Sequence, residues 1–149
     1  MTAAARIKRT HLKNADTLAY VVEAVGILEQ SDPTGDLARA LATHALMNWL
    51  NYEDIPMALL IADRAVTVAT DATDEVATLI ALEIKGAIMH SGGDRGGISL
   101  VEEGLRLAQR GNHAHEEVRA LINLAAMSGD ERDMERATDF ILRAHETAV

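Results

Sequence analysis

Apolar residues recur every three to four positions along most of the chain, and no stretch alternates steadily between apolar and polar residues. This spacing places apolar side chains on one face of an α-helix, whereas a half-buried strand requires alternation. Short segments rich in Gly, Pro, Asp and Asn separate the periodic stretches. The pattern predicts about seven helices, at residues 15–30, 36–51, 56–70, 75–90, 97–110, 116–128 and 134–148. We therefore expect an all-α fold.

Small residues within these helices reveal a repeat of about 40 residues. The same spacing of four, three and four positions occurs at Ala58, Ala62, Ala65 and Ala69, at Gly97, Val101, Gly104 and Ala108, and at Ala137, Ile141, Ala144 and Ala148. A weaker copy begins at Thr17. Such positions share one face of a helix, where small side chains allow a second helix to approach closely. Each copy follows another predicted helix and an acidic turn, so the repeating unit is helix–turn–helix.

Units of this kind cannot bury their outer faces alone and therefore stack on their neighbours. We expect a right-handed solenoid of antiparallel helical hairpins. The expected organisation is a basic segment at 1–14 and a single domain at 15–149, with a lone helix at 15–30 and repeats at about 36–74, 75–115 and 116–149.

Residues 121–144, "LINLAAMSGDERDMERATDFILRA", resemble a tetratricopeptide (TPR) repeat, with Asn123-Leu124-Ala125 at an Asn-Leu-Gly-like triplet and alanines at the family's small positions. Residues 86–108 are similar, with Gly86 near the small position of the first helix. The period exceeds the family's length of about 34 residues. It is similar to the helical arrays of MalT-like and LuxR-type signalling ATPases and regulators. The resemblance implies a TPR-like solenoid that binds proteins or peptides.

Charge is distributed unevenly along the chain. The net charge is −9, and Arg6, Lys8, Arg9 and Lys13 give +4 before the first acidic residue. The remaining 10 basic and 23 acidic residues give the body −13. An acidic body repels phosphate backbones, so we expect no nucleic-acid binding by this chain alone.

Cysteine is absent, which excludes disulfides and thiolate metal sites and is consistent with a cytoplasmic location. No apolar run reaches the length of about 20 residues that a bilayer requires, so we expect no membrane partner.

The glycine-rich stretch "HSGGDRGGIS" at 90–99 is a candidate phosphate-binding loop. A P-loop requires a preceding strand and a lysine followed by Ser or Thr, and this stretch has neither. We expect a turn instead, in which Gly92 or Gly93 ends one helix in a left-handed conformation, Asp94 caps the next helix and Gly97 packs closely. No cofactor site is predicted.

The pair His113 and His115 is a candidate for metal binding, but it supplies two ligands and requires a third from elsewhere. A solvated turn before a helix is the preferred interpretation, so no metal site is predicted. No nucleophile stands in a recognised triad or elbow motif. We therefore expect no catalytic residues and no enzymatic activity.

Four residues on predicted first helices are candidates for partner binding: Asn48, Trp49, Tyr52 and Asn123. Trp and Tyr are enriched among interface hot spots, although burial between repeats is the favoured interpretation for Trp49 and Tyr52. In peptide-binding TPR domains, asparagines at such places hold the peptide backbone or a terminal carboxylate. The acidic body argues against an acidic ligand here.

The first and last predicted helices are apolar on more than one face. We therefore expect either a longer array or ends covered by a partner, such as a second copy in a homodimer. The preferred function is a non-catalytic interaction or regulatory module that binds a peptide, a helix or itself. The alternative is a ligand-sensing segment of a larger bacterial transcription regulator or signalling ATPase.

Overall fold

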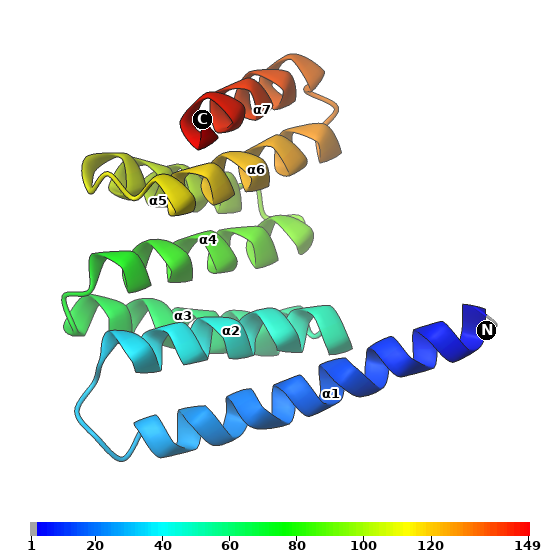
Figure 1. The fold of residues 1–149 in the computed structure, drawn as a ribbon, viewed down its shortest axis with the longest axis vertical. Coiled ribbons are helices and arrows are strands. Elements are labelled where there is room, and N and C mark those ends of the chain that lie inside the picture. Colours follow the sequence, from blue (N-terminus) through cyan, green and yellow to red (C-terminus); the bar gives the residue numbers. More distant parts are fainter. Residues whose placement is uncertain (1–2) are drawn as a thin grey trace.

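The computed structural model describes the backbone of residues 3–149 and the side chains of residues 16–149. Within this part the chain forms seven α-helices and no strand, which confirms the all-α prediction (Figure 1). The helices are α1 (Ala3–Leu28), α2 (Gly35–Tyr52), α3 (Ile55–Asp71), α4 (Glu75–Ser91), α5 (Gly96–Arg110), α6 (Ala114–Asp130) and α7 (Met134–Ala148).

The largest difference from the predicted boundaries is at α1, which begins at Ala3 instead of residue 15. The helix therefore includes most of the segment at 1–14, whose side chains lie outside the described residues. Alanine is the strongest helix former, and no proline or glycine interrupts the chain before Gly26. Hydrophobic periodicity begins only after this segment. The periodicity therefore predicted the packed part of the helix but not its first residues.

Consecutive helices pack in pairs: α2 with α3, α4 with α5, and α6 with α7. The pairs follow one another because α3 packs on α4, α5 on α6, and α2 and α6 both contact α4. In Figure 1, α1 lies at one end of this stack and α7 at the other. Among the described helices, the backbone of α1 packs against that of α2.

The repeated small residues lie where the two helices of each pair meet. Ala58, Ala62, Ala65 and Ala69 are fully buried. The second copy is also buried at all four positions, from Gly97 to Ala108. In the third copy Ala137 and Ala144 are buried, whereas Ile141 is 58% exposed. Among the described helices α7 contacts α6, and the side of α7 that carries Ile141 is left uncovered.

The closest approach is between Gly86 of α4 and Gly97 of α5. A Cβ atom on Gly86 would lie 2.5 Å from the carbonyl oxygen of Gly97. A Cβ atom on Gly97 would overlap the carbonyl oxygen of Gly86 and lie 2.9 Å from the backbone nitrogen of His90. The expected packing role of Gly97 is therefore confirmed.

Five turns contain a residue with positive φ, which in four of them directly precedes the capping residue of the next helix. The residues with positive φ are Glu53 (53°), Thr73 (52°), Gly93 (86°), Asn112 (56°) and Arg132 (62°). In three turns the next residue is an Asp whose side chain accepts a hydrogen bond from a backbone N–H three positions later: Asp54, Asp74 and Asp133. A carboxylate in this position satisfies one of the free N–H groups at a helix start.

The glycine-rich turn follows this pattern with one shift. Gly93, and not Gly92, takes the left-handed conformation. Asp94 accepts a hydrogen bond from the N–H of Gly96 at 2.8 Å, two positions later instead of three. Arg95 therefore occupies the cap position of α5, which corrects the prediction that Asp94 is the N-cap.

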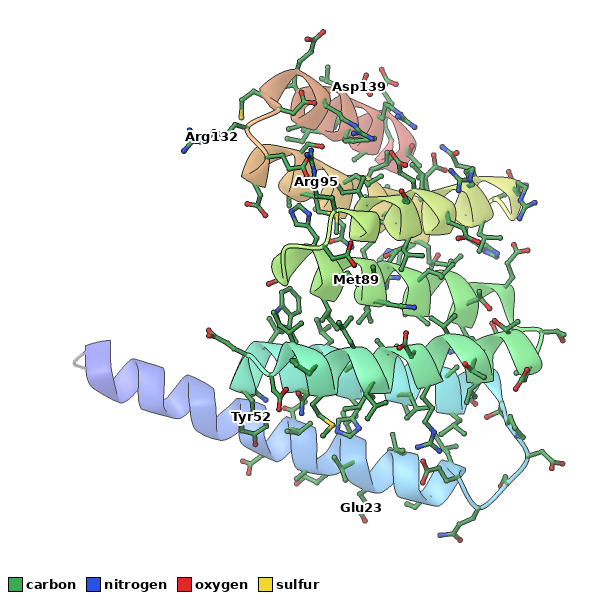
Figure 2. The ribbon with its side chains drawn as sticks, turned by 180° about the vertical axis from the view of Figure 1, so that it is seen from behind. Glu23, Tyr52, Met89, Arg95, Arg132 and Asp139 are labelled. Carbon is green, nitrogen blue, oxygen red and sulfur yellow. The ribbon has the colours of Figure 1, made fainter. Side chains whose placement is uncertain are left out.

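Ion pairs join each helix pair to the next across 34 to 36 positions of sequence. They are Arg39–Asp74 (3.0 Å), Glu83–Arg119 (2.8 Å), Arg95–Glu131 (3.0 Å for each of two hydrogen bonds) and Glu102–Arg136. Figure 2 shows Arg95 in the turn before α5, reaching toward the turn between α6 and α7. The Arg95 guanidinium lowers the pKa of Glu131 below its ordinary value.

Candidate ligand-binding groove

A groove of about 390 Å³ lies on the face where α2, α4 and α6 follow one another, and we call it the α2/α4/α6 groove. Its apolar lining consists of Leu46, Trp49, Ile84, Ala87, Ala126 and Met127. Its polar lining consists of Glu83, His90, Ser91, Arg119, Asn123 and Asp130. Apolar walls with a small set of polar groups are typical of ligand sites, which commonly measure about 300–1,000 Å³.

An ion pair between α4 and α6 is the most deeply placed polar feature of the groove. The Glu83 side chain is 1% exposed, and its Oε2 accepts a hydrogen bond from Nε of Arg119 at 2.8 Å. Oε1 of Glu83 and Nη2 of Arg119 are both buried and have no hydrogen-bond partner among the described residues. Buried polar atoms normally have a partner, so these two atoms are exceptions. Oε1 of Glu83 lies on the side of α4 that faces Gly104 of α5.

The surroundings of Glu83 disfavour its charged form. Burial raises the pKa of the Glu83 carboxyl, the hydrogen bond and the charge of Arg119 lower it, and the nearby Glu116 carboxylate raises it again. Burial is the largest of these effects, so the pKa lies above its ordinary value.

The local sequence explains how α4 holds a carboxylate at this depth. Glu83 lies one helical turn after the fully buried Leu79 and just under one turn before Gly86, on the packed face of α4. Gly104 of α5 faces this position, and a Cβ atom there would lie 3.2 Å from Cγ of Glu83. The glycine therefore leaves room for the Glu83 side chain between α4 and α5.

At the edge of the groove, His90 of α4 lies near Asp130 of α6. Nε2 of His90 is 3.6 Å from Oδ2 of Asp130, and the Asp130 side chain is 75% exposed. Arg119, Asn123 and Asp130 all line the groove from α6. This helix therefore contributes a cation, an amide and a carboxylate on one side.

The four candidate residues from the sequence do not meet at one place. Trp49 and Asn123 line the groove, and Trp49 also packs against the buried cluster around Ala45 and Ala58. Tyr52 is 62% exposed and does not line the groove, so the favoured prediction that it fills the core is wrong. Asn48 is partly buried outside the groove lining, and its Oδ1 lacks a hydrogen-bond partner.

Sequence reasoning missed Glu83 and Arg119. A signal was present, because Glu83 interrupts the apolar run "LIALEIKGAI" on the face that packs in α4. An acidic residue at such a position requires a partner in the fold. That partner lies 36 positions later, and periodicity alone does not identify it.

The two other candidate sites have ordinary structural surroundings. The stretch at 90–99 forms the end of α4, the following turn and the start of α5. Nε2 of His113 lies 3.5 Å from Oε1 of Glu75, while His115 is exposed. Among the side chains that the structure describes, no three His, Asp or Glu residues gather as metal ligands.

Within the described helices, none has the length and apolar character needed to cross a bilayer.

No protein-family model, curated protein or solved structure matches the chain.

Proposed function

We propose that this chain is a non-catalytic protein-interaction module that binds a peptide segment in the α2/α4/α6 groove. The observation that carries the proposal is the groove itself, which places the apolar wall of Trp49, Ala87 and Met127 beside the Glu83–Arg119 pair. Apolar contacts would supply affinity for a partner segment, and the polar groups would fix its orientation.

The TPR-like interpretation belongs to the same proposal. We take the stacked pairs to be antiparallel hairpins of a right-handed solenoid of the longer-period kind. The first helices α2, α4 and α6 would then form its concave face. The packing of successive pairs supports this, as does the place of the groove on the first helix of each pair. The proposed module acts in the cytoplasm, consistent with the absence of cysteine.

Selection of random 12-residue peptides displayed on phage against the full chain tests this function. Trp49 is the single tryptophan, so the fluorescence of the protein reports directly on the groove. Synthetic peptides from the selection, made without tryptophan, should change Trp49 emission in a saturable titration.

Filling the groove provides the matched control. Ala126 is exposed in the groove wall, whereas Ala19 is exposed on α1 at the end of the stack. Ala126→Phe should weaken peptide binding, and Ala19→Phe should leave it unchanged. The proposal fails when no peptide is enriched, or when enriched peptides bind both variants equally and leave Trp49 emission unaltered.

The size of the groove also favours a second candidate function. A volume of about 390 Å³ accommodates a small organic molecule. The chain would then be a ligand-sensing segment of a larger bacterial transcription regulator or signalling ATPase. Titrating small-molecule pools against Trp49 fluorescence separates this function from peptide binding, with Ala126→Phe again as the blocking variant.

Self-association is a separate part of the proposal. Tyr20 and Ile27 on α1, and Ile141 and Leu142 on α7, are exposed apolar side chains at the two ends of the stack. A second copy of the chain in a homodimer would cover one of these surfaces. Sedimentation velocity of the wild type, Ile27→Glu and Ile141→Glu measures whether either end supports a dimer.

A further inference from the structure

The two ends of the stack expose large apolar side chains. On α1, Tyr20 and Ile27 are seven positions apart and so share one side of the helix, which we call the α1 end. On α7, Met134 and Ile141 have the same separation, and with Leu142 they form the α7 end. All five side chains are more than half exposed. Stacked proteins normally have polar outer faces at their ends, so these surfaces indicate contact with another protein.

Ile141 occupies a position that is covered in the two other helix pairs. Its equivalents in the repeat are Ala62 of α3 and Val101 of α5, which are both fully buried. Ala62 belongs to a buried cluster with Ile88 of α4, and Val101 belongs to one with Leu121 of α6. The α7 end therefore corresponds to surfaces on which this chain already packs the next helix.

The α1 end is uncovered for a related reason. The helices α3, α5 and α7 each pack on the helix before them, whereas α1, in the part of the chain that the structure describes, packs mainly on α2 after it. Contact between the α1 end of one copy and the α7 end of another would cover both apolar surfaces. Pairing of two α1 ends, or of two α7 ends, would cover only one kind of surface and leave the other exposed.

Formal charge also favours contact between unlike ends. The helix α1 contains four basic and two acidic residues, a net charge of +2 with His neutral. The helix α7 contains two basic and three acidic residues, a net charge of −1. Unlike ends therefore attract, whereas two α1 ends or two α7 ends bring like charges together.

We infer that a second copy of this chain docks head to tail, with its α1 end on the α7 end of the first copy. Tyr20 and Ile27 of one copy pack against Met134, Ile141 and Leu142 of the other. The contact is heterologous, so a dimer keeps one free α1 end and one free α7 end, to which further copies add. This inference rests on the self-association in the proposed function. It specifies which surfaces meet and makes the homodimer the shortest of a series of assemblies.

Sedimentation velocity of the full chain at a series of concentrations tests the inference. The wild type should form species larger than a dimer as concentration rises. Ile27→Glu blocks the α1 end and Ile141→Glu blocks the α7 end, because burying an unpaired charge in an apolar contact is costly. Each variant alone should therefore stay monomeric. Leu50→Glu makes a comparable change at an exposed side chain of α2 and should associate like the wild type.

An equimolar mixture of the two variants gives the sharpest measurement. Ile27→Glu retains its α7 end and Ile141→Glu retains its α1 end, so the mixture should form a dimer and nothing larger. A mixture that stays monomeric overturns the inference. If circular dichroism shows that either variant is unfolded, Tyr20→Glu and Met134→Glu take their places.

The remaining outcomes separate this inference from the proposed function. If one variant alone still dimerises while the other is monomeric, two like ends pair, and the inference is overturned while self-association stands. A wild type that remains a dimer at every concentration also overturns it, because a head-to-tail contact leaves free ends. If the wild type is monomeric up to about 1 mM, self-association itself fails together with the inference, and peptide binding in the α2/α4/α6 groove is unaffected.

Discussion

Thr73 has a backbone conformation that its side chain disfavours. Its φ is 52°, in the left-handed region, where a Cβ atom approaches the following carbonyl oxygen. Branching at Cβ increases this cost, whereas asparagine tolerates the same region. The five turns each place one residue in the left-handed region, so the backbone strain in each turn depends on which residue type occupies that position.

Replacing Thr73 with glycine should stabilise the fold by about 0.5–1 kcal/mol. The relief of about 1–2 kcal/mol of left-handed strain exceeds the loss of about 0.5–1 kcal/mol from glycine's greater freedom in the unfolded chain. Asn112→Gly, at the equivalent turn with φ 56°, is the control and should change stability little. Urea denaturation measures both free energies of unfolding. Equal effects of the two variants would contradict this account of the strain.

Glu83 gives the stability of the protein a defined dependence on pH. Its pKa is raised in the folded state above the ordinary value of 4.5, so between these two values the folded protein retains a proton that the unfolded chain releases. The contribution of Glu83 to folding therefore decreases as pH rises from about 4.5 through the raised pKa.

Glu83→Gln removes this dependence. The free energy of unfolding of the variant minus that of the wild type should become more positive as pH rises through the same window, and then become constant. Urea denaturation at a series of pH values measures this difference, in which the contributions of other carboxylates largely cancel. The same replacement at the exposed Glu103 of α5 is the control. If this difference in free energy instead decreases as pH rises, the pKa of Glu83 is lowered in the folded state. Arg119 would then have a larger effect on that pKa than burial has.

At the scale of helices, the contact between α4 and α5 depends on Gly86 and Gly97. Gly97→Ala should destabilise the fold by about 1–3 kcal/mol, the usual cost of overpacking, because its Cβ atom meets backbone atoms that cannot move aside. Alanine's higher helix propensity offsets only about 1 kcal/mol of this. Gly26→Ala in α1 makes the same chemical change with no atom within 4 Å of the new Cβ, and it should stabilise the helix. Thermal unfolding of both variants tests the contrast.

The helices themselves were accessible from the sequence because apolar periodicity and short polar turns are local signals. The spacing of Ala58, Ala62 and Ala65 also identified a face that the structure buries completely. The candidate site was less accessible, because Glu83 and Arg119 are 36 positions apart and meet only when α4 and α6 lie side by side. Tyr52 was predicted wrongly for a different reason. It lies in an apolar stretch, but this position did not indicate that its side chain is exposed outside the packed surface.

At the scale of the whole molecule, packing is unequal along the stack. α4 contacts helices on both sides, α2 and α3 before it and α5 and α6 after it, whereas α1 packs mainly on α2 in the part of the chain that the structure describes. In stacked architectures, stability is the sum of units and the contacts between neighbours, so the ends open before the centre.

Hydrogen exchange should therefore divide the chain. Amides of α1 between Leu18 and Val25 should exchange about tenfold or more faster than those of α4 around Leu79, a difference of about 1.4 kcal/mol in opening free energy. Leu18→Ala should accelerate exchange in α1 and leave α4 nearly unchanged, whereas Leu79→Ala should accelerate all helices. Equal exchange in both helices would instead indicate a single cooperative unit.

The ion pairs between successive helix pairs have a further consequence during assembly. Alanine-rich faces of similar shape recur along the chain, so the wrong neighbours, or units from two different molecules, offer nearly equivalent packing. Each junction, however, has its own arrangement of charge: the basic residue comes first in Arg39–Asp74 and Arg95–Glu131, and second in Glu83–Arg119 and Glu102–Arg136. A unit displaced by one place would bring unmatched or like charges together. The ion pairs thus favour the native order of units along the stack.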